Sequence, residues 1–419
     1  MKVSGTVQVP GDKSISHRAL ICAALASGVS RVRGILQSED IQSTAGVLRS
    51  LGVQIPSLAS EMSIDGVGLD GLRESRLALQ CGNSGTTTRL LAGVAAACPF
   101  TSRFEGDASL SRRPMKRIAE PLTAMGARFD FERGDGLPMT IHGGDLSGIA
   151  WSTRASSAQT KSAILLAGLV AGVAVTVREL TRSRDHTERM LASLGVPMDV
   201  GETSVSLTPA PMLQVLDISV PGDPSSAAFP MALGALARFG EVRIPGVCVN
   251  ETRIGFLRVL ERMGGSVRLL EKKTIAGEPI ATIVVSPKTL RSTRVDANEV
   301  PALIDELPLL GCVAAASGVG LEVSGAEELR VKESDRISVL VANLRAIGAE
   351  AEEKRDGFRI LPRRRGSLRG RVTTQGDHRI AMAFGVLGFL DGNVIEIDDR
   401  ECVAISYPSF WTDLGGLVQ

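Results

Sequence analysis

Polar and cationic residues recur in this sequence at the starts of segments that are otherwise almost wholly apolar. Lys13, Ser14 and Arg18 open one such segment, and Ser157 and Gln159 open another. If these segments form helices, their first turns present unpaired backbone N–H groups and the positive end of the helix dipole, which favour bound anions. Lysine and arginine beside those turns add fixed positive charge. The pattern therefore predicts binding sites for small anions.

The same arrangement returns at Gly85 in GNSGTTTR, at Arg113 in SRRPM and at Arg379 in GDHR. A solvated cationic surface is the ordinary explanation for one such group, but recurrence at equivalent segment starts favours an anion-lined cleft. The sequence contains neither a GxxxxGK[ST] phosphate-binding loop nor a GxGxxG dinucleotide fingerprint. P-loop kinases and dinucleotide-dependent redox enzymes are therefore poorly supported.

Two charged clusters in the second half of the chain suggest acid–base chemistry. Asp305 lies inside the apolar run VPALIDELPLL, and a carboxylate so close to buried surface is either an ion-pair partner or a poised acid or base. The second cluster, RVKESDR, contains Lys332, Glu333 and Arg336, and at helical spacing Lys332 and Arg336 share one face. Taken alone, the second cluster is typical of a solvated, salt-bridged helix.

The apolar segments belong to an internal repeat. Residues 9–26 (VPGDKSISHRALICAALA) resemble residues 220–237 (VPGDPSSAAFPMALGALA), and four further segments share a polar or glycine-rich start followed by an Ala/Leu-rich run. A second, amphipathic helix pattern follows each and ends in an apolar residue plus a glycine suited to a left-handed cap, at Gly52, Gly126, Gly195, Gly264, Gly348 and Gly415. With the short alternating runs that indicate strands, the pattern predicts six α/β units.

Six units of this size fit two globular domains of three units each. The two clearest copies mark the points at which the chain crosses between the domains. We expect one domain from residues 13–222 and the other from residues 1–12 plus 223–419, with the chain passing between them at hinges near residues 12 and 222. Two such hinges permit the domains to close around a cleft. Similar βα patterns without a true repeat are the simpler alternative.

Composition narrows the function classes. The 47 Lys and Arg balance the 46 Asp and Glu, so the net charge does not favour electrostatic attraction of nucleic acids. The 419 residues include only 11 Phe, 2 Trp and 1 Tyr, which disfavours a surface on which bases stack. The six Cys lack metal-binding spacing and are expected to be reduced and buried. No secretory segment is visible at the start, and no apolar run reaches the roughly 20 residues of a membrane span. We expect a cytoplasmic protein.

Eight motifs, in their order along the chain, resemble the EPSP synthase (3-phosphoshikimate 1-carboxyvinyltransferase) family, and its second bacterial class in particular. They are PGDKSISHRA, GNSGTTTR, SRRPM, SSAQTKSA, SRDHTERM, DELP, ELRVKESDR and GDHRIAMA, and they cover nearly the whole sequence. The resemblance implies an α/β fold in which two domains form an inverse α/β barrel of six βαβαββ repeats. That architecture agrees with the repeat count reached above.

The resemblance further implies transfer of the enolpyruvyl group from phosphoenolpyruvate to the 5-hydroxyl of shikimate 3-phosphate, with release of phosphate, by addition and then elimination. The reaction belongs to the route to chorismate and the aromatic amino acids, and it requires neither a metal nor an organic cofactor. The implied partners are the two small substrates, without nucleic acid or membrane, and the chain is expected to be monomeric. Both substrates are multiply anionic, so fixed cations, an acid and a base suit the reaction.

Residue roles carry over from the family onto the matching motif positions. The residues implied for shikimate 3-phosphate are Lys13, Ser14, Arg18, Ser157, Ala158, Gln159, Arg184, Asp305 and Lys332. Those implied for phosphoenolpyruvate are Lys13, Gly85, Arg113, Gln159, Glu333, Arg336 and Arg379. The implied catalytic set is Asp305 as the base at the reacting hydroxyl, Lys332 and Glu333 for proton transfer at the phosphoenolpyruvate methylene, and Lys13, which contacts both substrates.

Three positions depart from the pattern of some family members, and a fourth predicts the response to a herbicide. Ala158 replaces a second serine of first-class members, as the second class does, and Glu328 replaces an asparagine that some relatives use toward the substrate. Ile405 stands where first-class members have a lysine, so one cation toward phosphoenolpyruvate is missing. In this family a side chain at the position of Gly85 crowds the herbicide glyphosate, so the glycine predicts glyphosate sensitivity.

Two other functions stay open at this point. The sister enolpyruvyltransferase that acts on UDP-N-acetylglucosamine resembles this fold but carries a reactive cysteine on a loop of its first domain. The corresponding residues here, 104–117, contain no cysteine, and Cys98 falls at the end of an apolar helix pattern. The other alternative is a non-catalytic anion-binding protein, which would not need Asp305, Lys332 and Glu333 together.

Overall fold

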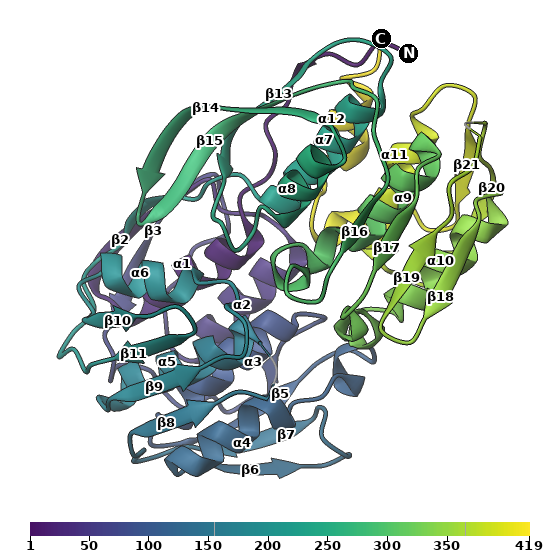
Figure 1. Cartoon of the computed structure of the whole chain (residues 1–419). Coiled ribbons are helices and arrows are strands. Elements are labelled where there is room, and N and C mark those ends of the chain that lie inside the picture. Colours follow the sequence, from purple (N-terminus) through teal and green to yellow (C-terminus); the bar gives the residue numbers. More distant parts are fainter. Residues whose placement is uncertain (155, 365) are drawn as a thin grey trace. The chain divides into compact units, whose positions relative to one another are not determined.

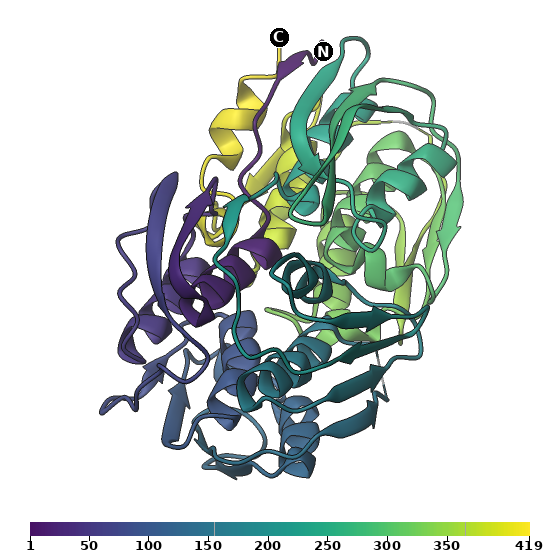
Figure 2. The same cartoon turned by 90° about the vertical axis from the view of Figure 1, so that its left-hand side faces the viewer.

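The structure, a computed structural model, describes residues 1–154, 156–364 and 366–419. These residues separate into two compact units (Figures 1 and 2). Unit 1 comprises Met1–Pro10, Pro221–Thr274 and Pro279–Gln419, and unit 2 comprises Gly11–Val220 together with Ile275–Glu278. No pattern in the sequence indicated that the short segment Ile275–Glu278 belongs to unit 2, and the hinges near residues 12 and 222 stay a prediction.

Unit 2 contains helices and short strands in alternation. Its helices are α1 (Lys13–Leu25), α2 (Glu39–Ser50), α3 (Gly85–Ala96), the 3-10 helix η1 (Leu110–Arg112), α4 (Lys116–Met125), α5 (Ala158–Ala171) and α6 (His186–Ser193). Its strands are β2 (Ser27–Arg33), β3 (Glu61–Val67), β4 (Leu79–Gln80), β5 (Thr101–Glu105), β6 (Arg128–Phe131), β7 (Met139–His142), β8 (Ile149–Ser152), β9 (Val175–Arg178), β10 (Met198–Val200), β11 (Ser204–Leu207) and β12 (Asp217–Ser219).

Two sheets of unit 2 share one topology. In the sheet ordered β4-β5-β7-β6, β4 and β5 run parallel with α3 between them in the chain, whereas β7 is antiparallel to both β5 and β6. The sheet ordered β8-β9-β11-β10 is built in the same way with α5 and α6. The chain order is βαβαββ in each. In the sheet β12-β2-β3, the parallel first strand comes from the far end of the unit.

Unit 1 repeats this plan. Its helices are α7 (Pro224–Leu236), α8 (Gly255–Arg262), η2 (Val300–Ala302), η3 (Ile304–Glu306), α9 (Leu307–Ser317), η4 (Glu327–Val331), α10 (Arg336–Ala346), α11 (His378–Gly388), η5 (Glu401–Ile405) and α12 (Phe410–Gly415). Its strands are β1 (Gly5–Thr6), β13 (Val242–Cys248), β14 (Ser266–Ile275), β15 (Glu278–Ser286), β16 (Thr293–Val295), β17 (Leu321–Val323), β18 (Ala351–Lys354), β19 (Gly357–Ile360), β20 (Arg369–Val372) and β21 (Val394–Ile397).

Three sheets of unit 1 complete the repeat. They are ordered β1-β13-β15-β14, β16-β17-β19-β18 and β20-β21, and each begins with a parallel pair whose second strand follows a helix of this unit, α7, α9 or α11. Strand β1 comes from the N-terminal segment, and the two chain ends lie side by side in this unit, where Lys2 and Gln419 exchange backbone hydrogen bonds (Figures 1 and 2). The described residues thus form six related sheets, which confirms the predicted repeated α/β fold.

The helix that opens each repeat is buried around its circumference, as its uniform apolarity predicted. Every residue of α5 from Thr160 to Leu169 is buried. Small residues allow close packing: a Cβ on Gly93 of α3 would lie 2.2 Å from the Ala163 carbonyl oxygen of α5. Side chains cap most of these helices at their N-termini and fix where each begins: Asp12, Ser84, Ser157, Asp223 and Asp377.

In five of the six repeats, the second helix is followed by the predicted glycine cap. Positive φ angles, between 84° and 127°, occur at Gly52, Gly126, Gly195, Gly264 and Gly348. The sixth prediction was wrong, because Gly415 lies within the last turn of α12 and not after it.

Two expectations from composition can also be compared with the structure. All six cysteines are buried free thiols, as predicted. Among the described residues, no helix is both long enough and apolar enough to cross a membrane.

Candidate functional site

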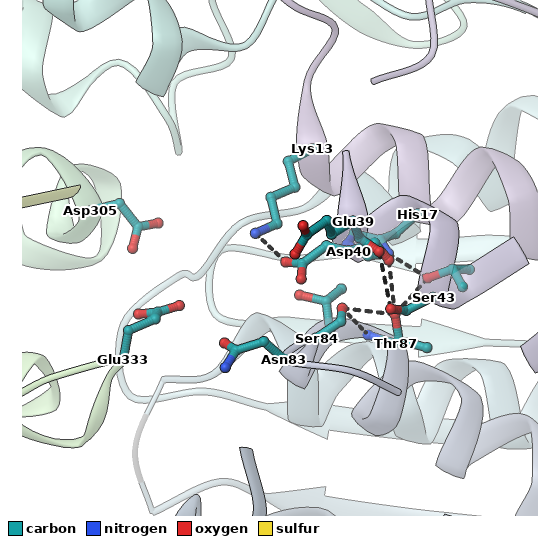
Figure 3. A network of polar contacts seen from close by, with 12 residues as sticks. Lys13, His17, Glu39, Asp40, Ser43, Asn83, Ser84, Thr87, Asp305 and Glu333 are labelled. Atoms are coloured by element: carbon teal, nitrogen blue, oxygen red, sulfur yellow. Dashed lines mark hydrogen bonds and ion pairs between the residues drawn. The ribbon is translucent and has the colours of Figure 1, made fainter. Parts of the chain in front are cut away.

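Lys13 opens α1 and pairs with a carboxylate of α2. Asp12 accepts a hydrogen bond from the Ile15 backbone N–H at 2.8 Å and so fixes the start of α1. The Lys13 ammonium forms an ion pair with Asp40 in the first turn of α2, and the Lys13 side chain stays 19% exposed. Figure 3 shows Lys13 extended toward Asp40. Lys13 is therefore oriented at a helix start while part of its side chain is accessible.

Arg18 lies one turn further into α1 and is buried. Its guanidinium donates to Thr187 Oγ1 at 2.6 Å, to Ser162 Oγ at 2.8 Å and to the Ser14 carbonyl at 2.9 Å. Burial lowers the pKa of Arg18 from its ordinary value; Glu188 opposes the shift and Arg184 adds to it. The acceptors in these three bonds are neutral oxygens, so a phosphate or carboxylate would add a charge-assisted bond to this cation.

A chain of side-chain contacts joins α1, α2 and α3. His17 Nδ1 is 2.7 Å from Thr44 Oγ1, which is 2.7 Å from Thr87 Oγ1, and Thr87 donates to the capping hydroxyl of Ser84 at 2.7 Å (Figure 3). Burial, together with the charges of Lys13 and Arg18, lowers the pKa of His17 well below 6.5. His17 thus helps to hold the three helices against one another.

Gly85 is the first residue of α3 and lies beside two arginines. A Cβ at this position would be 2.9 Å from Arg89 Nη1 and 3.6 Å from Arg113 Nη1. Arg89 donates to Gln159 Oε1 at 2.7 Å, and Arg113 donates to Asn83 Oδ1 at 2.6 Å. The missing side chain therefore keeps space next to two oriented guanidinium groups.

Ser157 and Gln159 flank Ala158, the first residue of α5. The Ser157 hydroxyl caps the helix by accepting a hydrogen bond from the Thr160 backbone N–H at 3.3 Å. Gln159 Nε2 donates to Thr86 Oγ1 at 3.0 Å, which links the first turns of α5 and α3. Arg184 precedes α6 and is half-buried. These residues extend the group around Lys13, Arg18 and Gly85 within unit 2.

Unit 1 contains the second group of predicted residues. Asp305, 14% exposed in η3, has its Oδ1 atom 3.4 Å from Arg336 Nη1 and 3.8 Å from Lys332 Nζ. The Asp305 carboxylate thus lies beside two cations and remains partly accessible. The geometry suits Asp305 to act as a base.

Arg336 is the centre of this group and is only 2% exposed in its side chain. It donates from Nε to Asp377 Oδ2 at 2.8 Å and from Nη2 to Glu333 Oε2 at 2.6 Å, in addition to its contact with Asp305. Although burial opposes the charged form, Asp377, Glu333 and Asp305 together raise the pKa of Arg336 above its ordinary value. Arg336 is therefore a permanent cation shared by three carboxylates.

The predicted common helix face of Lys332 and Arg336 was wrong. Lys332 follows the last turn of η4, and α10 begins only at Arg336, because Asp335 caps it by accepting from the Ser338 backbone N–H at 3.1 Å. Both cations still lie close to Asp305, so a turn brings them together where a helix was expected.

Arg379 lies in the first turn of α11 next to the same group. Its backbone N–H donates to Asp377 Oδ1 at 2.9 Å, and its guanidinium Nη1 is 4.0 Å from Glu306 Oε1. No group of three or more His, Cys, Asp or Glu side chains that could hold a metal ion occurs in the part of the chain that the structure describes.

The structure thus gathers the predicted residues into one set in each unit. Unit 2 holds Lys13, Ser14, Arg18, Gly85, Arg113, Ser157, Ala158, Gln159 and Arg184, and unit 1 holds Asp305, Lys332, Glu333, Arg336 and Arg379. Sequence reasoning missed Asp40, Ser162 and Thr187, which orient Lys13 and Arg18. Their only local signal is a polar residue within the first or second turn of a helix.

Comparison with known proteins places this geometry in context. The EPSP synthase (3-phosphoshikimate 1-carboxyvinyltransferase) family profile matches residues 1–414. The 3-phosphoshikimate 1-carboxyvinyltransferase of Syntrophomonas wolfei is 43% identical over 416 residues, which cover 99% of this chain and 97% of the relative. The enzyme of the same name from Sulfurihydrogenibium sp. is 44% identical over 418 residues, with 99% and 97% covered.

Solved structures are also similar. An EPSP synthase from Acinetobacter baumannii has a TM-score of 0.88 and 39% sequence identity, with 100% of this chain and 96% of that chain covered. The enolpyruvyl transferase NikO from Streptomyces tendae has a TM-score of 0.75 at 17% identity, with 99% and 95% covered, and so shares the fold alone.

Proposed function

The chain belongs to the EPSP synthase family, and on that premise we propose that it is a transferase that moves the enolpyruvyl group of phosphoenolpyruvate to the 5-hydroxyl of shikimate 3-phosphate. The products are 5-enolpyruvylshikimate 3-phosphate and phosphate, on the route to chorismate and the aromatic amino acids. The observation that carries the proposal is the cluster of Asp305, Lys332, Glu333 and Arg336, which places two carboxylates beside two cations within one unit.

Shikimate 3-phosphate takes the residues at the starts of α1 and α5 and the arginine that precedes α6. They are Lys13, Ser14, Arg18, Ser157, Ala158, Gln159 and Arg184, together with Asp305 and Lys332 of unit 1. Arg18 supports this assignment because its three hydrogen bonds run to neutral oxygens, so a phosphate would bring the opposite charge to a buried guanidinium.

Phosphoenolpyruvate takes Lys13, Gly85, Arg113, Gln159, Glu333, Arg336 and Arg379. The space beside Gly85 is bordered by the Arg113 guanidinium, which suits a small anion. Arg336 already contacts three carboxylates, so binding exchanges some of them for oxygens of the substrate. That exchange releases Glu333 and Asp305 for proton transfer. Ile405 at the end of η5 supplies no cation, and Arg113, Arg336 and Arg379 carry the anion.

The chemistry proceeds by addition and elimination. In the addition, Asp305 accepts the proton of the substrate 5-hydroxyl, and the oxygen of that hydroxyl bonds to C2 of phosphoenolpyruvate. Glu333 or Lys332 delivers a proton to the methylene carbon. In the elimination, the group that protonated the methylene, Glu333 or Lys332, takes a proton back from the new methyl group, and the bond between C2 and the phosphate oxygen breaks. Phosphate departs with the electron pair of that bond and takes up the proton held by Asp305. Lys13 and the arginines stabilise the charge that develops on the oxygens. The proton balance closes, and the steps require no cofactor.

Release of phosphate from phosphoenolpyruvate tests the proposal. We expect release that depends on added shikimate 3-phosphate and is absent with shikimate lacking the phosphate. Release with UDP-N-acetylglucosamine but not with shikimate 3-phosphate would assign the sister reaction instead. No release with either acceptor would leave a non-catalytic anion-binding protein.

The thiols of this chain disfavour the sister reaction. Cys98, the cysteine nearest in sequence to the region where that enzyme carries its reactive thiol, is buried, and burial raises its pKa to about 12. A nucleophilic cysteine instead needs an accessible thiolate. A monomeric state, a cytoplasmic location and the absence of nucleic-acid or membrane partners stay predictions from the sequence.

A further inference from the structure

A buried lysine in the first turn of α5, Lys161, lies between Glu188 in the first turn of α6 and Glu179 directly after β9. Lys161 Nζ is 2.7 Å from Glu179 Oε2 and 2.7 Å from Glu188 Oε1, and the three side chains are at most 4% exposed. Burial alone would lower the pKa of Lys161, but Glu188 and Glu179 raise it above its ordinary value. These three residues, here called the Glu–Lys–Glu triad, contribute no direct substrate contact to the function proposed above.

One arm of the triad leads to Arg18. Lys161 and Glu188 are direct neighbours in sequence of Ser162 and Thr187, so their ion pair fixes α5 against α6 at the level of these two hydroxyls. The Ser162 and Thr187 hydroxyl oxygens are 2.6 Å apart, and both accept hydrogen bonds from the Arg18 guanidinium. A shift between the two helices would therefore misplace Arg18.

The other arm leads to Arg184. Glu179 follows β9, and its carboxylate accepts the Ser183 hydroxyl at 2.5 Å and the Ser183 backbone N–H at 3.3 Å. Ser183 directly precedes Arg184. Lys161 thus holds, through Glu179, the end of the loop from which Arg184 projects.

Electrostatics gives the triad a second task. Arg18 and Arg184 carry like charges close enough for Arg184 to lower the pKa of Arg18, and Glu188 is the largest opposing charge. The negative charge of the triad therefore helps two arginines to remain near each other before an anion binds.

Resting on the function proposed above, we propose that the Glu–Lys–Glu triad is a positioning device, in which Lys161 acts through Glu188 and Glu179 to hold Arg18 and Arg184 in the arrangement that receives the phosphate of shikimate 3-phosphate. Lys161 is a positioning residue and not a catalytic one, because its ammonium is occupied by both carboxylates.

The first test is calorimetric binding of shikimate 3-phosphate to the full chain. We expect Lys161→Met to weaken binding roughly tenfold or more, since coupled buried groups change affinity on that scale, and to leave KM for phosphoenolpyruvate within about twofold. Leu169→Ala, a cavity in the last turn of the same buried helix, is the matched control for lost stability. Equal weakening by both variants, at comparable losses in Tm, would overturn the proposal.

A double-mutant cycle supplies a second test that does not need Lys161→Met to fold. Glu179→Ala is expected to weaken shikimate 3-phosphate binding in the wild type but to cause no further loss in an Arg184→Ala background, because it acts through Arg184. An equal loss of affinity in both backgrounds would contradict the claim that Glu179 acts through Arg184. Failure of the wild type itself to bind shikimate 3-phosphate would refute the proposed function, whereas normal binding by all triad variants would refute only the positioning role.

Discussion

Asp305 is the residue on which the proposed chemistry depends most. Its carboxylate lies within 4 Å of two cations, Lys332 and Arg336, and is partly exposed. A partly exposed carboxylate can be reached by a substrate hydroxyl and accept its proton. Arg336 keeps two further carboxylates, Glu333 and Asp377, so the loss of Asp305 does not leave that buried cation without partners.

Asp305→Ala should therefore fold and bind both ligands but lose most turnover, by roughly 10²- to 10⁴-fold, the usual contribution of a general base. Ligand binding by calorimetry and kcat by phosphate release measure the two effects separately. Asp296→Ala, at an exposed carboxylate of the same unit, serves as the control. Near-normal turnover in Asp305→Ala would remove Asp305 from the catalytic set.

Gly85 predicts the response to glyphosate. A side chain here would meet Arg89 and stand 3.6 Å from the Arg113 guanidinium assigned to phosphoenolpyruvate. We expect millimolar glyphosate to inhibit the wild type in competition with phosphoenolpyruvate, and Gly85→Ala to be inhibited less. Steady-state inhibition kinetics check this. Full wild-type activity at millimolar glyphosate, with ordinary phosphoenolpyruvate affinity, would refute the predicted sensitivity.

At the scale of elements, the helix starts do most of the positioning. Capping side chains determine where α1, α3, α5 and α11 begin, and hydroxyl chains fix neighbouring starts against each other. The chain from His17 through Thr44 and Thr87 to Ser84 is buried, and burial lowers the pKa of its histidine well below 6.5. The protonation state of His17 is therefore part of the stability of unit 2.

His17 predicts a loss of stability in mild acid. Its pKa lies well below 6.5 in the folded chain, so below pH 6.5 the unfolded chain takes up a proton that the folded chain does not. The destabilisation is small above pH 6.5 and grows as the pH falls below that value. Wild-type Tm should therefore fall more between pH 8 and pH 5.5 than the Tm of His17→Gln. Equal decreases in both proteins would contradict a neutral buried His17.

Local patterns in the sequence were sufficient to predict some features of the fold and the site but not others. The apolar helices and five glycine caps follow from periodicity and from backbone freedom at glycine, which are local properties. The contact of Asp40 with Lys13 joins residues of two helices, and no local pattern encodes it. The turn at Lys332 was misread because a capping residue, Asp335, interrupts charges that otherwise have helical spacing.

At the scale of the whole molecule, the topology explains why two sequence copies resemble each other so closely. Strand β1 precedes the copy at residues 9–26 but pairs in unit 1 with β13, and β12 precedes the copy at residues 220–237 but pairs in unit 2 with β2. Each copy thus follows a strand that belongs to the other unit. We propose that the two units are the domains expected from the sequence, joined by hinges near residues 12 and 222.

Substrate binding should then change the overall dimensions. The residues proposed to bind each substrate come from both units. We therefore expect the radius of gyration from small-angle scattering to decrease when shikimate 3-phosphate is present together with either glyphosate or phosphoenolpyruvate. The decrease should exceed that with shikimate 3-phosphate alone. An unchanged radius with both ligands bound would count against hinged domains.

The measurement that tests the central claim most directly is a ³¹P NMR time course with both substrates and the full chain. We expect the phosphoenolpyruvate signal to convert to inorganic phosphate while the phosphate of shikimate 3-phosphate stays covalently attached, with one enol ether formed at the 5-oxygen for each phosphate released. Phosphate release without shikimate 3-phosphate, or release of its own phosphate, would contradict enolpyruvyl transfer.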